Sequence, residues 1–207
     1  MLMHKKEIIV GYRIFFALLA FSSIVTEIAV LVERGRFNPA NFFSFFTIES
    51  NAIAIVVFMA SAFALARGRQ GRMITLLRGA STFNMILVGV VFSILLSGLD
   101  VELTAVPWDN IVLHYIMPVV VALDWFVDQP GRGRISFKHG LLWMIFPLLY
   151  VIYSLVRGAA VGWYPYPFLN PVVQGYPSVA LTSLCIAVGG CGLVWMLTRV
   201  SGQTGKR

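Results

Sequence analysis

The segment FFTIESN, residues 45–51, places two hydroxyls, a carboxylate and an amide near the start of a long apolar run. A helix would present Thr47, Ser50 and Asn51 on one face, because they are separated by three and four residues. His114, in the run LHYIMPVVVALDW, is the one histidine inside the apolar segments. A neutral imidazole can take the proton of an alcohol that attacks an ester. These residue types predict acyl transfer, with Thr47 or Ser50 as nucleophile and His114 as general base.

The residue pattern leaves the roles around His114 open. Ser50 has the less hindered hydroxyl because its β-carbon is unbranched, so spacing does not choose between Ser50 and Thr47. The oxyanion of an acyl-transfer intermediate requires a preorganised hydrogen-bond donor, and the candidates are Asn51 and Tyr115. The carboxylates that are candidates to orient the imidazole are Glu27, Glu49 and Asp109.

The composition is that of a membrane protein. Of the 207 residues, 58% are hydrophobic and 12% are charged, whereas about a quarter of the residues of a soluble domain are charged. The charges fall between apolar blocks of about 20 residues, the length that crosses the hydrocarbon core of a bilayer. The net charge of +7 is not gathered into a basic stripe, so nucleic acid is not an expected partner. The sequence predicts an integral, multi-pass membrane protein surrounded by membrane lipids.

Six apolar blocks have the length of a membrane span. Backbone groups in lipid must be hydrogen-bonded internally, and the blocks are too long for barrel strands, so each block is predicted to be a helix. We therefore expect an all-α, polytopic bundle of six transmembrane helices that forms one domain over residues 1–207. The expected spans are residues 8–32, 43–66, 79–99, 111–127, 140–156 and 178–198.

The orientation of the spans follows from Lys and Arg, which concentrate in cytoplasmic loops. Of the 16 basic residues, all but Arg34, Arg36 and Arg157 lie on one side of the expected spans. Both termini are therefore expected to be cytoplasmic. Thr47 and His114 then each lie about 5–6 Å below the outer ends of their helices. This matching depth predicts that the two side chains share one layer toward the extracytoplasmic side.

Intramembrane ionisable residues also fit a second class of function, because they mark ion and proton pathways. Glu27 falls in the same layer as Thr47, and Asp124 lies about 15 Å deeper. A small transporter or ion/proton channel would use Glu27, His114 and Asp124 as relay points. Arg13, near the inner end of the first span, is expected to extend toward the headgroups and to take no part in chemistry.

No metal or cofactor is predicted. Cys185 and Cys191 both lie inside the last apolar block, and their spacing matches neither a disulfide framework nor a metal site. A haem held between two histidines would require a second histidine within the spans. The sequence has none there, so the candidate chemistry uses side chains alone.

Three segments, FFTIESN, LHYIMPVVVALDW and WYPYPFLNP, resemble the androgen-induced-gene/FAR-17a-like family of integral-membrane hydrolases, and especially its bacterial branch. The segments occur in the family's order, and the similarity runs over nearly the whole chain. The best-studied animal members are intramembrane threonine hydrolases that cleave fatty acid esters of hydroxy fatty acids with one Thr and one His. The resemblance implies that Thr47 is the nucleophile and His114 the base, and it implies a bacterial plasma membrane.

The expected substrate is a lipid ester whose acyl chains lie in the bilayer, cleaved through an acyl-enzyme. Arg157, at the outer end of the fifth span, is a candidate to hold a carboxylate or phosphate of the substrate. The segment WYPYPFLNP follows that span and is expected to form an aromatic lid. Its Trp163 and Tyr166 are candidate substrate-binding residues.

Overall fold

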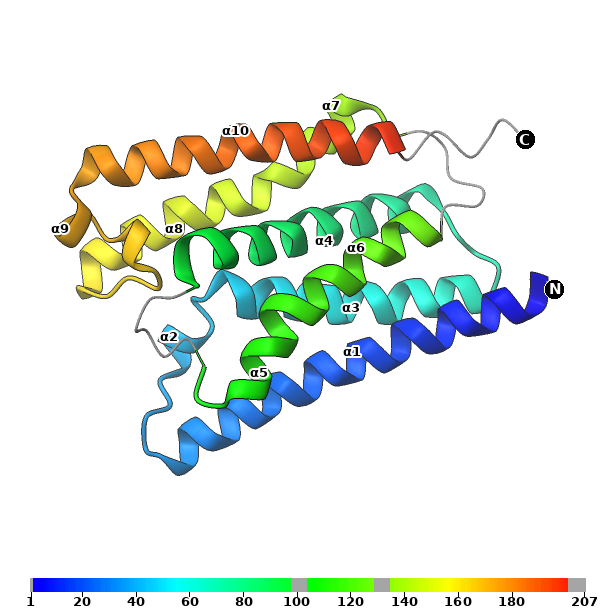
Figure 1. The fold of residues 1–207 in the computed structure, drawn as a ribbon, viewed down its shortest axis with the longest axis horizontal. Coiled ribbons are helices and arrows are strands. Elements are labelled where there is room, and N and C mark those ends of the chain that lie inside the picture. Colours follow the sequence, from blue (N-terminus) through cyan, green and yellow to red (C-terminus); the bar gives the residue numbers. More distant parts are fainter. Residues whose placement is uncertain (1, 98–103, 129–134, 201–207) are drawn as a thin grey trace.

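The computed structural model describes residues 2–97, 104–128 and 135–200, and it is helical throughout with short connections (Figure 1). No strand occurs among those residues. Six helical segments are long and apolar enough to cross a membrane, which confirms the prediction of an all-α protein with six helical segments of that length. The segments are Lys5–Glu33, Phe46–Ala66, Arg72–Leu96, Pro107–Val127, Phe137–Val161 and Tyr176–Val200.

Three of the six segments are single α-helices and three are composite. The single helices are α1 (Leu2–Glu33), α3 (Phe46–Ala66) and α10 (Tyr176–Val200). The third segment joins α4 (Arg72–Val91) to a π-helical turn, η1 (Phe92–Leu96). The fourth joins α5 (Pro107–Ile111), a second π turn, η2 (Val112–Ile116), and α6 (Met117–Val127). The fifth joins α7 (Phe137–Gly140), the 3-10 turn η3 (Leu141–Met144) and α8 (Ile145–Val161).

Short helices gather at one end of the bundle, which we call the loop end. They are α2 (Pro39–Phe42), the 3-10 turn η4 (Pro167–Leu169) and α9 (Pro171–Gln174). Each begins with proline, whose fixed φ and missing N–H suit the first helical position. The start of α1 and the end of α10 lie at the opposite end, the terminal end (Figure 1). Because α2 occupies residues up to Phe42, α3 begins at Phe46, slightly later than the expected start of the span at residue 43.

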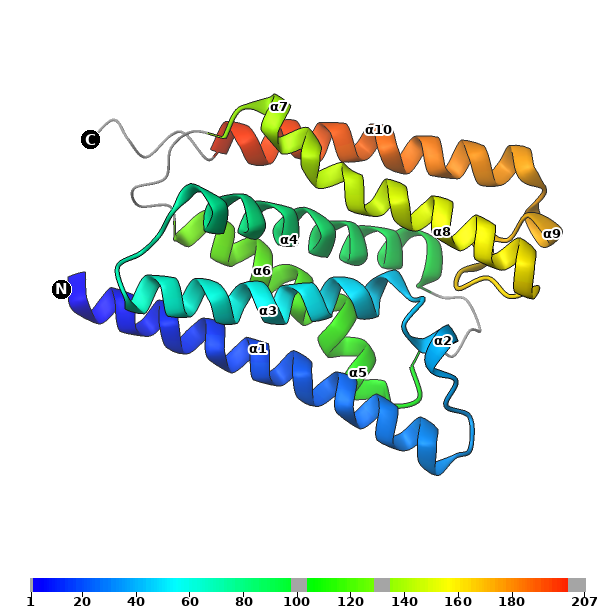
Figure 2. The ribbon, with the colours of Figure 1, turned by 180° about the vertical axis from the view of Figure 1, so that it is seen from behind.

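The helix α3 lies between α1 and α4, and α6 packs on α4. Figure 2 shows α1, α3, α4 and α10 following one another across the molecule, with α8 beside α10. Small residues permit the close approach of α1 and α3, since Ala17, Ala20 and Ala54 are almost fully buried in the cluster between them. Small side chains at helix interfaces are typical of membrane bundles.

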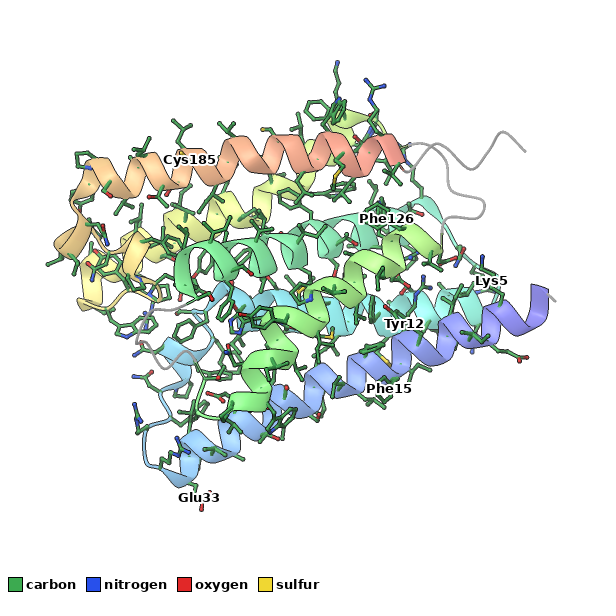
Figure 3. All side chains as sticks on the ribbon, in the orientation of Figure 1. Lys5, Tyr12, Phe15, Glu33, Phe126 and Cys185 are labelled. Carbon is green, nitrogen blue, oxygen red and sulfur yellow. The ribbon has the colours of Figure 1, made fainter. Side chains whose placement is uncertain are left out.

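The outside of the bundle is apolar. Phe15, Phe63 and Val56 are each more than half exposed, and Figure 3 shows Phe15 directed away from the neighbouring helices. Tyr12, three residues earlier, instead donates its hydroxyl hydrogen to the Val120 carbonyl at 2.7 Å and joins α1 to α6. Water would disfavour such an apolar exterior, whereas lipid accommodates it. The arrangement therefore fits a multi-pass membrane protein.

Candidate active site

Thr47 and His114 are in contact at the loop end of the bundle. Thr47 lies in the first turn of α3, and His114 lies in the π turn η2. The Thr47 Oγ1 atom is 3.2 Å from His114 Nε2, and the two residues are 7% and 4% exposed. The layer expected from equal depth along two helices is therefore present as a direct hydrogen bond.

The hydrogen-bond partner of its other nitrogen fixes the tautomer of His114. Nδ1 lies 3.2 Å from the main-chain carbonyl oxygen of Asn110. Because a carbonyl oxygen only accepts, Nδ1 carries the hydrogen, and a neutral imidazole then has a lone pair on Nε2. Nε2 accepts the hydrogen bond from the Thr47 hydroxyl. A main-chain carbonyl thus orients the imidazole in the way that a carboxylate does in many hydrolases.

The imidazole lies at the contact between two π turns, η2, which carries it, and η1. The Phe92 ring on η1 stacks on the His114 ring, with 4.1 Å between centroids and 28° between planes. Gly89 permits the close approach of α4 to α6, because a Cβ at position 89 would lie only 3.0 Å from Cβ of Pro118. Single π turns inside α-helices are frequent at functional sites. The ring therefore has one defined position, with Phe92 on its face and a carbonyl at its edge.

Tyr166 completes the contacts of Thr47. Its hydroxyl oxygen lies 3.3 Å from both the Thr47 amide nitrogen and Thr47 Oγ1. The amide N–H donates to the phenol, which leaves the phenolic hydrogen available for donation. Burial raises the pKa of Tyr166 above its ordinary value, so the phenol stays neutral.

The connection between α8 and α10 holds Tyr166 in place. Its ring stacks on Phe168 at 5.3 Å and meets the edge of Phe45 at 5.7 Å. The next residues form η4, after which the Asn170 side chain accepts from the Val172 amide at 3.0 Å and caps α9. The sequence pointed to Tyr166 only as a substrate-binding residue. Its contact with Thr47 could not be predicted, because no helical period relates this loop to α3.

The other candidate residues, Asn51, Ser50 and Tyr115, differ in their contacts. Asn51 Nδ2 donates to the Thr47 carbonyl at 2.9 Å and to the Leu113 carbonyl at 3.2 Å, which joins α3 to η2. Ser50 is fully buried, and its hydroxyl has no hydrogen-bond partner among the described residues. Tyr115 is 43% exposed and packs on the edge of Phe92. The structure therefore brings Asn51 to Thr47 as a positioning residue and turns Tyr115 away.

The candidate orienting carboxylates bond elsewhere. Glu27 Oε1 accepts from the Ala105 amide at 2.7 Å, and Asp109 Oδ1 accepts from the Ser23 hydroxyl at 3.2 Å. Glu49 is only half-buried, on another face of α3 from Thr47. Over residues 2–97, 104–128 and 135–200, no carboxylate forms a hydrogen bond with His114.

Two cavities meet at Thr47, and Thr47 and Tyr166 line both. The first, the apolar cavity, has a volume of about 90 Å³ and lies among α4, α8 and α10. The second, the polar cavity, has a volume of about 270 Å³ and lies at the loop end. Polar and aromatic side chains of the polar cavity include Glu27, Arg36, Asn38, Asn41, Thr104, His114 and Trp163. The hydroxyl of Thr47 thus lies between an apolar and a polar compartment.

Arg157 and Trp163 lie together beside the polar cavity. Arg157 Nη2 donates to Asn41 Oδ1 at 2.7 Å, and its guanidinium carbon lies 5.1 Å from the centre of the Trp163 ring. Asn41 and Trp163 both line the cavity. Arg157 therefore contacts two residues that line the polar cavity and is not itself among the lining residues.

A second buried polar group, nearer the terminal end, consists of Arg13, Arg78, Asp124 and Asp128; we call it the four-charge cluster. Arg13 Nε donates to Asp124 at 2.8 Å, and Arg78 Nη1 donates to Asp128 at 2.9 Å. Arg13 also bonds Asp128, and Arg78 also bonds Asp124. All four side chains are at most 4% exposed.

The four-charge cluster corrects the expectation for Arg13. The residue is fully buried and does not extend toward the headgroups, because two carboxylates inside the bundle neutralise it. Asp124, the deep relay point of the channel hypothesis, accepts hydrogen bonds from both arginines at this cluster. Its charge is therefore engaged in joining α1, α4 and α6.

No family model, curated protein or solved structure matches this chain. The chemistry of the site is therefore inferred from its geometry, together with the resemblance of three sequence segments.

Proposed function

We propose that this protein is an intramembrane carboxylic ester hydrolase that cleaves fatty acid esters through an acyl-threonine intermediate. The observation that carries the proposal is the 3.2 Å contact between Thr47 Oγ1 and His114 Nε2. The carbonyl bonded to Nδ1 leaves Nε2 free to accept a proton. Nucleophile and base within hydrogen-bond distance, with a third group orienting the base, are the recurring arrangement of covalent hydrolases.

The reaction has two halves. His114 Nε2 takes the hydroxyl proton as Thr47 Oγ1 attacks the ester carbonyl carbon, and the tetrahedral intermediate collapses when Nε2 returns this proton to the leaving alkoxide. The acyl chain is then bonded to Thr47, and the alcohol departs. In the second half, Nε2 takes a proton from water, the hydroxide attacks the acyl carbon, and Thr47 leaves with that proton. The products are one alcohol and one fatty acid, and the enzyme is restored.

The phenol of Tyr166 is the best-placed donor for the oxyanion. The phenol is neutral, and its oxygen lies 3.3 Å from Thr47 Oγ1. Because this oxygen accepts from the Thr47 amide, the phenolic hydrogen is directed away from that amide and can be donated to the oxyanion. The first turn of α3 adds the positive end of a helix dipole at the same place. Donors fixed in advance in a water-poor site stabilise a developing oxyanion strongly.

The proposed location is a bacterial plasma membrane, with both termini in the cytoplasm and the site toward the extracytoplasmic side. The distribution of Lys and Arg supports this orientation. Lys6, whose ammonium donates to the Ala66 carbonyl at 2.8 Å, and Arg67 both lie at the terminal end. The aromatic segment around Trp163 and Tyr166 lies at the loop end, where membrane proteins place Trp and Tyr near the lipid headgroups.

A fluorophosphonate probe tests the proposal, because it forms a covalent bond only with an activated nucleophile. Purified native protein and the Ser50→Ala variant are expected to be labelled, and the Thr47→Ala variant is expected to stay unlabelled. Hydrolysis of long-chain fatty acid esters by the same three proteins should follow the labelling. Equal labelling of native and Thr47→Ala protein would remove Thr47 from the mechanism, and loss of labelling in Ser50→Ala alone would transfer the role to Ser50.

A further inference from the structure

The apolar cavity extends along α4 away from Thr47. Its lining residues on α4 and η1 run from Leu96 to Phe83. From Phe92, whose ring stacks on His114, to Phe83 the separation is about 14 Å at the helical rise per residue. The cavity walls on α8 and α10 carry almost only apolar side chains. The space is therefore long and apolar, with the reactive hydroxyl at one end.

Three residues form the end of the apolar cavity farthest from Thr47. Gly190 on α10 faces Phe83 and Met144, and a Cβ at this glycine would lie 3.3 Å from Phe83 Cζ and 3.4 Å from Met144 Cε. The adjacent Gly189 points elsewhere, since a Cβ there would meet nothing within 4 Å. The missing side chain at position 190 thus keeps this end of the cavity open.

One side of the apolar cavity faces the surroundings of the bundle. Leu148 on α8 is 50% exposed, and Ile186 and Ala187 on α10 are partly exposed, yet all three line the cavity. In a membrane these residues contact lipid. An acyl chain can therefore pass between α8 and α10 from the bilayer without crossing water.

The two cavities differ in chemistry as the two parts of an ester do. The polar cavity, on the other side of Thr47, presents the Glu27 carboxyl, the Arg36 guanidinium and two Asn side chains. In the apolar cavity the methylenes of an acyl chain meet almost only apolar side chains, so the chain keeps the apolar surroundings that it has in the bilayer. A polar alcohol part finds charged and amide side chains on the other side.

We propose, on the basis of the hydrolase function proposed above, that the substrate is a single-chain fatty acyl ester with a polar alcohol part. The acyl chain enters from lipid between α8 and α10 and fills the apolar cavity. The alcohol part occupies the polar cavity, so the scissile carbonyl lies at Thr47. Phe83, Met144 and Gly190 set the longest acyl chain that fits.

The acyl preference of matched variants tests this assignment. The p-nitrophenyl esters of butyrate, octanoate, dodecanoate and palmitate are given to native protein and to Gly190→Val, Gly189→Val and Met144→Ala variants in detergent. The quantity compared is the ratio of kcat/KM for palmitate to that for octanoate, because a ratio within one preparation is independent of the folded fraction. Gly190→Val should lower this ratio by about tenfold or more, since the added side chain shortens the cavity and the longer acyl chain then overpacks its end. Met144→Ala should raise it, and Gly189→Val should leave it unchanged.

A binding measurement separates failure of the cavity assignment from failure of the hydrolase proposal. Fatty acids of the same four lengths displace a fluorescent fatty acid from Thr47→Ala protein, with and without Gly190→Val. If native protein hydrolyses none of the esters but Gly190→Val selectively weakens palmitate binding, the hydrolase proposal fails and the acyl assignment stands. If hydrolysis is observed and its chain-length ratio is the same in all four proteins, the acyl assignment is overturned and the hydrolase remains.

Discussion

The four-charge cluster and the Thr47–His114 site both bury polar side chains in a membrane-spanning bundle, but they satisfy them differently. In the cluster, Arg13 donates to two carboxylates and also to the Ser61 carbonyl. At the site, the imidazole is neutral, its partner is a hydroxyl, and two cavities adjoin it. The four side chains of the cluster are at most 4% exposed and bond one another.

The four-charge cluster should therefore contribute mainly to stability, and the Thr47–His114 site mainly to reactivity. Isolated charges are costly in lipid, so paired ones are retained where they hold helices together. Unpaired neutral groups cost less and keep the capacity to bond a substrate. Ser50 Oγ and Asn51 Oδ1, close to Thr47 in the chain, are buried without a partner among the described residues. Buried polar atoms of this kind are rare in native proteins and call for an explanation. Variants in the two regions should therefore fail in different assays.

The largest effect should come from His114→Gln, which removes the base and keeps an amide of similar polarity. We expect kcat for ester hydrolysis to fall by about 10³-fold to 10⁴-fold, equivalent to about 4–5.5 kcal/mol. The free energy of unfolding should fall by only about 1 kcal/mol, the value of the lost ring stacking on Phe92. Esterase assays and denaturant unfolding on one preparation measure both. A His114→Gln protein with native kcat would assign the base to another group.

The opposite behaviour is expected of Asp124→Asn in the four-charge cluster. The substitution leaves two buried guanidinium groups with one carboxylate, which should cost about 3–5 kcal/mol of unfolding free energy. The hydrolysis rate of the remaining folded protein should be native. Glu33→Gln, at an exposed position on α1, is the matched control and should unfold like the native protein. The charge-balanced double variant Arg13→Met/Asp128→Leu should lose less stability than Asp124→Asn, and the reverse order would contradict the pairing described here.

The six spans and the Thr47–His114 layer could be predicted because both depend on local regularities. Hydropathy over about 20 residues locates a span, and a rise of 1.5 Å per residue converts a residue's distance from the helix end into depth. That conversion places Thr47 and His114 at one depth, although it does not choose between Thr47 and Ser50. Helical spacing also predicted that Asn51 lies near Thr47. Its amide, expected as a candidate oxyanion donor, instead donates to the Thr47 and Leu113 carbonyls and joins α3 to η2.

The four-charge cluster could not be predicted from hydropathy, because charged residues themselves mark the apparent ends of apolar blocks. The third span was expected to begin at residue 79, but α4 begins at Arg72, so Arg78 lies inside it. Asp128 likewise follows the last residue of the expected fourth span. Two members were thus assigned to loops, and Arg13 was left without a partner. Tyr166 was expected only as a substrate-binding residue, and its contact with Thr47 could not be predicted because its loop has no period that relates it to α3.

Tyr166→Phe examines the part of the site that sequence did not reveal. Removal of one preorganised oxyanion donor should lower kcat by about 10²-fold to 10³-fold, with KM nearly unchanged. Because burial raises the pKa of Tyr166, the phenol keeps its hydrogen as pH rises to its ordinary pKa of about 10. The ratio of native to Tyr166→Phe kcat should therefore be constant from neutral to mildly alkaline pH. A ratio near one at neutral pH would mean that the phenol is not the donor, and a ratio that falls over that range would mean that the phenol ionises there.

The smallest effect should come from Gly89→Ala, which perturbs the support of His114 and no polar group. The added Cβ would lie 3.0 Å from Cβ of Pro118 and 3.7 Å from the His114 carbonyl oxygen, so α4 and α6 must separate by a few tenths of an ångström. Overpacking of this kind costs about 1–3 kcal/mol, partly offset by the gain of about 1 kcal/mol for Gly→Ala in a helix. Gly11→Ala on α1, where a Cβ meets nothing within 4 Å, isolates that gain and should be stabilising. Relative to Gly11→Ala, Gly89→Ala should unfold at lower denaturant and show a lower kcat, because the imidazole moves from the Thr47 hydroxyl. A Gly89→Ala protein that matches Gly11→Ala in both measurements would show that the α4–α6 contact does not position the base.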